Sequence, residues 1–378
     1  MKERIRDIKL DVMKGILIIF MVWTHVLRPG TKFIESFNMP VFFMISGIFL
    51  KNCNSFSDLF NCSIKKIKTL YVYYITTNLL FLLFHNFFVS INFYTNDNAV
   101  LDFFPNLELY DKYSFKDFCF RLILVLTTCG GTQLGGATWF FRALFFSSLL
   151  YLFISFIFYK IGITKIEYSQ LLVAILLILL TIFLSKKELF VFGKNILIWV
   201  NQVFIAYSMF PLGKILYSHI PRLFENKKRR LVVFFVALTI LLLPIPYNVN
   251  ISKGYLYNPY ILLSSVFGFL FIYSISFFIV NSKLYITHFL SLLGENTVFI
   301  VALHLFFFKF LNVVFINIYH YPKYCIAGFP SVLRLSQNTL MYITWGIVYI
   351  FIGIVCPLIL EILYKRIKQK MKEVCIHG

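Results

Sequence analysis

Long apolar runs separated by short polar segments dominate the chain from end to end. Ten of these runs predict helices that are long enough to cross a bilayer, or nearly so. They lie near residues 10–28, 34–50, 70–90, 137–159, 169–184, 196–218, 231–246, 259–280, 296–316 and 339–363. Because the runs are continuous rather than alternating, they favour helices over the strands of a membrane β-barrel. The pattern predicts an all-α fold, a polytopic transmembrane helical bundle of about ten spans.

A shorter apolar run over residues 118–129 does not fit this series. It is too short to cross a bilayer comfortably, and it contains Arg121. We expect this segment to be interfacial or re-entrant. If it crossed the membrane, every later loop would change side.

The composition excludes a soluble globular enzyme and also a disordered or fibrous chain. Of the 378 residues, 60% are hydrophobic and 14% are charged, against about 25% charged in a typical soluble domain. A soluble fold of this length could not bury so much apolar surface. The seven cysteines form no CxxC pair, so neither a zinc site nor a dithiol redox site is expected, and no metal is predicted.

The basic residues predict the orientation of the chain. The net charge is +20, and with the N-terminus inside, the inner segments hold 21 of the 36 Lys and Arg, against 11 in the outer segments. This excess favours cytoplasmic termini, a multi-pass protein of the plasma (inner) membrane, and a basic cytoplasmic tail over 364–378. The charge therefore suits membrane lipids as partners rather than nucleic acid. The first apolar run lacks a cleavage site and is interpreted as a retained helix.

Ionisable residues inside apolar spans are costly, so they are candidates for function. The first span contains Asp11, Lys14 and His25. Asp11 and Lys14 are spaced to pair on one helix face, and Lys14 and His25 lie about three turns apart, on the same face. Lys14 and His25 could line one groove, with His25 as a general base. The alternatives are an ion pair at the inner interface and a histidine that serves packing.

Other polar residues lie at the ends of spans or within them. Asn38, at the start of the second span, could cap that helix or face the same groove. Arg142 and Trp139 begin the fourth span, where Arg142 could be a snorkelling anchor and Trp139 part of an aromatic belt. Asn296 begins the ninth span, and His304 within it could serve a helix–helix hydrogen bond.

Five segments together carry a resemblance to a known family. They contain, in order, Arg6, Asp11, Lys14, Gly15 and His25; FNMPVFFMISG at 37–47; KKIKTLYVYY at 65–74; Trp139 to Phe145; and Gly294, Asn296, Thr297 and His304. Over residues 6–360 the chain resembles the acyltransferase-3 family of integral membrane O-acyltransferases, and most closely its fucose 4-O-acetylase-like sugar acetyltransferases. It departs from the pattern at Asn38, where many members have histidine, and at Tyr71–Tyr73, near a usual proline. The resemblance implies one membrane-embedded acyltransferase domain over 1–378.

The resemblance also implies a reaction, in which acetyl-CoA donates an acyl group to a sugar hydroxyl. The acceptor would be a cell-surface polysaccharide or a lipid-linked glycan. His25 would be the general base, or alternatively the nucleophile of an acyl-histidine relay, and Arg142 or Asn38 would stabilise the oxyanion. Secondary candidates are His304, Asn296 and Trp139. The donor's phosphates would lie among Arg6, Lys14 with its partner Asp11, Lys65, Lys66 and Lys68.

Two other classes of protein would also need polar groups inside the membrane. A transporter or flippase for a glycan precursor is the main alternative, but such proteins more often show an internal repeat and broken helices in matching positions. The sequence shows neither feature. A structural scaffold would not account for an ion pair and a histidine in one helix.

Overall fold

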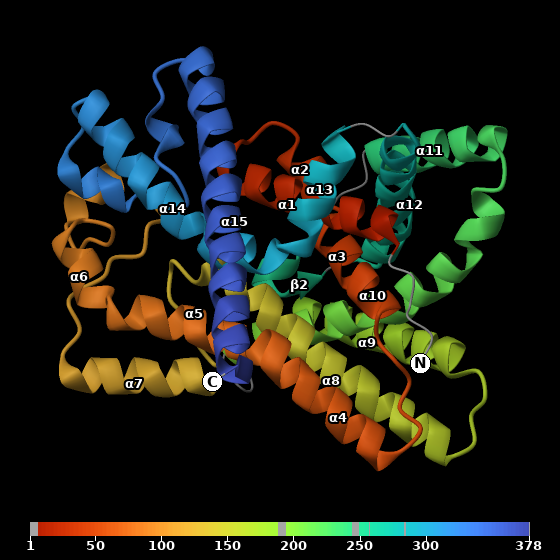
Figure 1. Ribbon diagram of the computed structural model, residues 1–378. Helices are drawn as coiled ribbons and strands as arrows, with labels where there is room; N and C mark the ends of the chain where they lie inside the picture. Colours follow the sequence, from red (N-terminus) through yellow and green to blue (C-terminus); the bar gives the residue numbers. More distant parts are fainter. Residues whose placement is uncertain (1–6, 188–193, 244–248, 257, 283–284, 378) are drawn as a thin grey trace. The chain divides into compact units, whose positions relative to one another are not determined.

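The computed structural model (Figure 1) describes residues 7–187, 194–243, 249–256, 258–282 and 285–377. The fifteen α-helices of this part are α1 (Ile8–Val26), α2 (Thr31–Glu35), α3 (Asn38–Ile48), α4 (Phe56–Lys66), α5 (Val72–Leu83), α6 (His85–Ser90), α7 (Phe115–Leu126), α8 (Trp139–Lys160), α9 (Ile166–Lys187), α10 (Lys194–Leu223), α11 (Lys227–Leu242), α12 (Tyr260–Asn281), α13 (Tyr285–Glu295), α14 (Thr297–Ile318) and α15 (Thr339–His377). A two-residue antiparallel pair, β1 (Val249–Asn250) and β2 (Tyr255–Leu256), joins Val249 to Leu256.

Short helical turns complete the secondary structure of the described residues. A π-helical turn covers Ile67–Tyr71, between α4 and α5. Turns of 3₁₀ helix cover Asn98–Asp102, Gly136–Thr138, Ile251–Lys253, Lys323–Ala327 and Leu333–Leu335.

The chain forms two compact units. The first unit comprises Met1–Met21, Gly30–Tyr73 and Trp139–Glu295; the second comprises Val22–Pro29, Tyr74–Thr138 and Asn296–Gly378. Helix α1 contributes its first part to one unit and its last turn to the other. Each unit is described below by itself.

In the first unit, α10 packs against α3, α8 and α9, while α4 runs alongside α8 (Figure 1). Small residues allow the backbones of α3 and α10 to approach closely. A Cβ on Gly47 would lie 2.4 Å from the Cα of Phe210, and one on Gly213 would lie 2.2 Å from the carbonyl oxygen of Met44. Close crossings at small residues are a common means of helix association in membranes.

A second close crossing in the first unit joins α1 to α13. A Cβ on Gly15 would lie 2.1 Å from the carbonyl oxygen of Leu290, and one on Gly294 would lie 1.9 Å from that of Asp11. Any larger side chain would push the two helices apart. The glycines that flank Lys14 and Asn296 in the sequence therefore have a packing role.

In the second unit, α14 packs against α15 and against the 3₁₀ turn at Lys323–Ala327. Gly353 of α15 brings its backbone close to Phe308 of α14, where an added Cβ would lie 2.5 Å from the ring. Gly346 likewise brings the backbone of α15 close to the side chain of Leu27, which follows α1. The long helix α15 thereby fixes both α14 and the end of α1.

The observed helices coincide with the ten predicted runs, with three differences. The predicted span 70–90 is interrupted at Phe84, so that α5 and α6 are separate helices. Helices α2, α4 and α13 were not predicted as separate helices. The last predicted helix, 339–363, continues to His377 and takes most of the basic tail with it.

Among the described residues, five helical segments are long and apolar enough to cross a membrane: Gly136–Lys160, Ile166–Lys186, Tyr260–Asn281, Thr297–Ile318 and Thr339–Met371. The chain is thus a multi-pass membrane protein. Helix α1 contains Lys9, Asp11 and Lys14 in its 19 residues, and α3 has only 11 residues, so neither is of this kind. The number of ten spans and the side of the two termini stay predictions.

Most of the segment 118–129 lies in α7, Phe115–Leu126. Ser114 and Asp117 form a reciprocal capping box at its start. Its 12 residues are too few to span a bilayer, and Phe115, Phe120 and Ile123 are exposed. An amphipathic helix with exposed aromatic and aliphatic side chains is typical of the membrane interface. That the segment is interfacial or re-entrant stays a prediction.

Candidate functional site

His25 and His304 lie together in the second unit. Their ring centroids are 5.1 Å apart, and the rings are tilted by 35°. His25 is in the last turn of α1 and is half-buried, whereas His304 lies on α14 and is fully buried. Of the two, His25 is therefore the less buried histidine.

The hydrogen bonding of His304 defines which ring nitrogen carries its proton. Nδ1 lies 2.8 Å from the carbonyl oxygen of Ile300. Because a carbonyl only accepts, Nδ1 must carry the proton and donate it, which makes Nε2 the acceptor of a neutral ring. Nε2 is buried and has no hydrogen-bond partner in the described part of the chain. The pair thus places the half-buried His25 beside a fixed imidazole whose acceptor nitrogen has no hydrogen-bond donor among the described residues.

The end of α1 is held in place by Tyr342 of α15. The backbone N–H of Arg28 donates to the Tyr342 hydroxyl at 2.8 Å, and this hydroxyl donates to the carbonyl oxygen of Val26 at 3.4 Å. A carbonyl near the end of a helix lacks an intrahelical donor, and Tyr342 supplies one here. The backbone on either side of His25 is therefore tied to α15.

The glycine-rich loop over 130–136 is organised by Asn78 of α5. The Asn78 amide donates to the backbone of Tyr74 and to the Thr138 hydroxyl, each at 2.9 Å, and accepts from the backbone N–H of Thr132 at 2.8 Å. A Cβ on Gly135 would lie 2.4 Å from this amide oxygen. The loop continues into Gly136–Thr138, which packs on α14, the helix that carries His304.

Asn78 was not among the residues that we selected from the sequence. It lies in an apolar run, YVYYITTNLLFLL, as one amide among many aliphatic and aromatic residues. A buried polar residue within a span is the signal that could have identified it.

Asn296 precedes the first residue of α14, eight residues before His304. Eight residues of helix correspond to about 12 Å. The Lys365 ammonium donates to the Asn296 amide oxygen at 2.6 Å and pairs with Glu361 at 2.9 Å. These contacts connect the start of α14 to α15, which indicates a structural role for Asn296.

Asp11 and Lys14 form the predicted ion pair in the first unit. Their charged atoms are 2.7 Å apart, with the Asp11 side chain 6% exposed and that of Lys14 24% exposed. The predicted ion pair between Asp11 and Lys14 is therefore present in the structure. Lys14 can meet an anion only by sharing its ammonium with Asp11.

Asn38 does not cap the second predicted span. Phe37 occupies the capping position of α3, and no side chain caps the helix there. Asn38 lies in the first turn, is buried, and has an amide oxygen without a hydrogen-bond partner among the described residues. Such an oxygen needs a donor, so this orientation suits a ligand hydroxyl better than an oxyanion.

Arg142 and Trp139 lie in the first turn of α8. The Arg142 guanidinium donates to the side-chain oxygen of Gln202 at 2.8 Å, and Gln202 donates to the backbone oxygen of Ser252 at 2.6 Å. The bond to a neutral amide leaves the positive charge of Arg142 in place. Trp139 packs edge-on against Phe140.

The basic run lies at the end of α4 and in the π-helical turn that follows. Lys65 and Lys68 are exposed and Lys66 is half-buried. Burial lowers the pKa of Lys66, and the charge of Lys65 lowers this pKa further. Arg6, the remaining predicted donor ligand, lies outside the described residues.

A buried lysine on α14 has a structural role that the sequence did not reveal. Lys309 donates to the carbonyl oxygens of Ala327 and Gly328 at 2.7 Å and 3.1 Å. Asn312, one turn below, donates to the same segment and accepts from Tyr349 of α15 at 2.6 Å. Lys309 therefore satisfies backbone carbonyls of the loop. No cluster of three metal-ligating side chains occurs in the described ranges.

Comparison with known protein families agrees with the sequence motifs. The model of a family described as an acyltransferase domain matches residues 7–362. The chain belongs to the acyltransferase-3 family. As a member of this family it is a membrane acyltransferase, and the match covers both histidines and the Asp11–Lys14 pair. No curated protein and no solved structure matches the chain.

Proposed function

We propose that this membrane acyltransferase transfers an acetyl group from acetyl-CoA to a hydroxyl of a cell-surface polysaccharide or lipid-linked glycan. The observation that carries the proposal is the pairing of a half-buried histidine with a fully buried one in a chain of this family. Acyl transfer to a hydroxyl requires a base near neutral pH, and histidine is suited to that task. The similarity to fucose 4-O-acetylase-like enzymes suggests the sugar.

In the proposed reaction, the acceptor hydroxyl oxygen attacks the thioester carbonyl carbon while His25 takes the hydroxyl proton. The carbon–sulfur bond then breaks, the ester forms, and the CoA thiolate leaves and recovers the proton from His25. His304 acts as a positioning residue, because its ring lies against that of His25 and its own proton is held by Ile300. Arg142 is proposed to stabilise the oxyanion, whereas Asn38, whose amide oxygen is unpaired among the described residues and can only accept, is better suited to bind the acceptor hydroxyl.

The alternative mechanism uses His25 as a nucleophile, with an acyl-histidine intermediate that the hydroxyl then attacks. Labelled acetyl-CoA separates the two, because only the relay leaves label on His25. The phosphates of the donor are proposed to lie among Lys14, Lys65, Lys66 and Lys68, where charge-assisted hydrogen bonds can form. Transport of a glycan precursor is the weaker proposal, since it does not explain the family match.

The proposal is tested by mass spectrometry of surface glycans from cells with and without this protein. We expect the glycans of expressing cells to carry additional mass equal to one acetyl group per modified sugar. Unaltered glycan masses together with acylated lipid or protein would assign a different acceptor. A change in the amount of glycan at the surface without any mass change would favour transport.

A further inference from the structure

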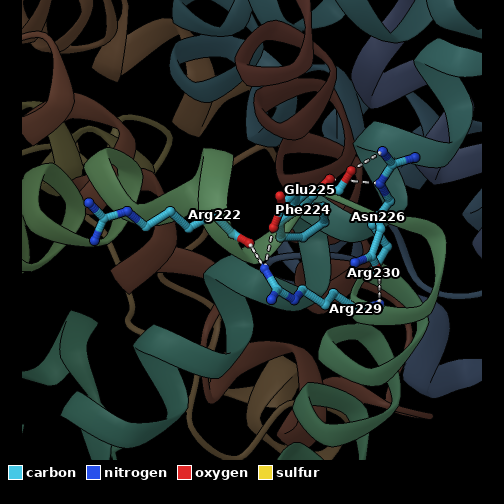
Figure 2. A network of polar contacts seen from close by, with 6 residues as sticks. All are labelled: Arg222, Phe224, Glu225, Asn226, Arg229 and Arg230. Carbon is cyan, nitrogen blue, oxygen red and sulfur yellow. Dashed lines mark hydrogen bonds and ion pairs between the residues drawn. The ribbon is translucent and has the colours of Figure 1, made fainter.

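The turn between α10 and α11 gathers a dense cluster of positive charge. Between residues 222 and 230 there is one carboxylate, Glu225, and there are five cations: Arg222, Lys227, Lys228, Arg229 and Arg230. In membrane proteins such clusters set topology, and that function alone requires no defined geometry. The turn does have a defined geometry (Figure 2).

Two of the five cations hold the turn together. The Arg230 guanidinium donates to the carbonyl oxygen of Phe224 at 2.8 Å and lies 4.4 Å from the centre of the Phe277 ring. Arg229 pairs with Glu225 and also donates to the carbonyl oxygen of Arg222 at 3.3 Å (Figure 2). The turn is therefore held by contacts of these two side chains with its own backbone, with Glu225 and with Phe277.

The other three cations are not used in this way. Arg222, Lys227 and Lys228 are exposed, and no carboxylate of the described segments forms an ion pair with any of them. Glu225 compensates one charge only, and it is already engaged by Arg229. The turn thus keeps an excess of positive charge available to an anion.

An open groove of about 410 Å³ lies beside this turn. Its lining combines the cations Arg222, Lys228 and Arg229 with the apolar side chains of Leu223, Val232 and Val233. Grooves of a few hundred Å³ are of the size that holds small ligands. The lining calls for a ligand with an anionic group joined to an apolar part.

The apolar wall continues along α11 beyond the groove. Val232, Phe235 and Val236 are 53%, 59% and 45% exposed. They recur at helical spacing on one face, which in a membrane protein is a face that contacts lipid chains. A molecule whose anion lay among the cations could therefore extend its chains along this face.

We propose that this groove binds the phosphodiester of an anionic phospholipid, with the acyl chains lying along α11. Arg222 and Lys228 would donate to the phosphate, and Arg229 would share its guanidinium between the phosphate and Glu225. A free phosphate compound would use the same cations, but it would gain nothing from the apolar wall. This site is independent of the acyl-transfer reaction, since none of its residues has a role in it.

Binding is tested with the full-length protein in detergent, by native mass spectrometry and by thermal stability in titrations of phosphatidylglycerol. We expect phosphatidylglycerol to bind and to raise the melting temperature, and phosphatidylcholine to do neither. The double variant Arg222→Gln/Lys228→Gln should bind phosphatidylglycerol at least about tenfold more weakly. The matched double variant Lys160→Gln/Lys165→Gln removes two exposed cations from another turn and should bind as the wild type does.

A gain in affinity provides a readout that misfolding cannot mimic. Glu225→Gln removes the carboxylate that competes for Arg229, so it should strengthen phosphatidylglycerol binding several-fold. Equal affinity in wild type and Arg222→Gln/Lys228→Gln would overturn the site. The lipid assignment would be overturned if inorganic phosphate or CoA stabilised the wild type as much as the lipid does and lost this effect in the double variant.

Discussion

Lys14 has two roles in this account. Its ammonium neutralises the buried Asp11 carboxylate at 2.7 Å, and it is also a proposed ligand of the donor's phosphates. Removing only one partner of a buried pair leaves an uncompensated charge, which costs about 3–5 kcal/mol. A single variant would therefore confuse loss of folding with loss of donor binding.

A paired design separates these tasks. We expect Lys14→Gln to lower the amount of folded protein, and Asp11→Asn/Lys14→Gln to restore it because no buried charge remains. At matched abundance both variants should raise the KM for acetyl-CoA about tenfold, since one charge-assisted contact is lost. The measurement is initial rate against donor concentration. An unchanged KM in the double variant would leave Lys14 with the structural task alone.

The lowered pKa of Lys66 predicts that donor binding depends on pH. Its pKa is lowered from the ordinary 10.5 by burial and by Lys65, so its charge is lost at a lower pH than that of an ordinary lysine. The folded protein then binds fewer protons than the unfolded one, and its stability rises as pH rises towards 10.5. Affinity for an anionic donor changes in the opposite direction, weakening over the same interval.

Calorimetric titration with CoA across alkaline pH tests this prediction. The dissociation constant of the wild type should rise with pH, whereas Lys66→Arg should flatten the curve because arginine keeps its charge. Lys68→Arg is the control and should follow the wild type. A wild-type curve that Lys66→Arg does not alter would exclude Lys66 from donor binding.

Among the elements, the crossing of α1 and α13 depends on Gly15 and Gly294. Gly294→Ala would place a Cβ 1.9 Å from the carbonyl oxygen of Asp11, which is backbone and cannot rotate away. We expect a loss of at least about 1–3 kcal/mol in stability, measured as a lower melting temperature in detergent. Gly136→Ala, whose Cβ would meet Leu305 at an ordinary 3.9 Å, should change little. Similar melting temperatures for the two variants would contradict this crossing.

The hydrophobic pattern predicted most helices because an apolar run of twenty residues has few other structures available in a membrane. It failed for α4, FSDLFNCSIKK, which is amphipathic and buries no residue, so no apolar run marks it. It also failed at Phe84, where the helix breaks directly before the polar pair His85–Asn86 within the predicted span 70–90. That polar pair was a signal for the break, and it was not used.

The candidate site was only partly accessible from the sequence, for a related reason. Histidines inside spans stood out by their cost, so His25 and His304 were both selected. Their contact depends on how α14 packs beside the end of α1, which is a tertiary property. Conversely, Asn296 was selected by its motif, yet its contacts to Lys365 place it in the α14–α15 packing.

For the whole molecule, the distribution of basic residues predicts the topology. Reporter fusions at Lys51, Asp102, Asn226 and the C-terminus should report inside, outside, inside and inside, because the inner segments hold 21 of the 36 basic residues. The measurement is the activity of reporters that work on one side only. An external C-terminus would contradict the ten-span prediction, and α7 would then be the first segment to reconsider.

The central claim is that His25 is the base of an acyl transfer from acetyl-CoA to a glycan hydroxyl. It is tested most directly by transfer of labelled acetyl to glycan in membranes that contain wild type, His25→Ala or His304→Ala at equal abundance. A general base contributes roughly 10²–10⁴ in rate, so His25→Ala should abolish detectable transfer. His304→Ala should lose less, because His304 only positions its neighbour. Near-normal turnover in His25→Ala, with transfer lost in His304→Ala, would contradict the account.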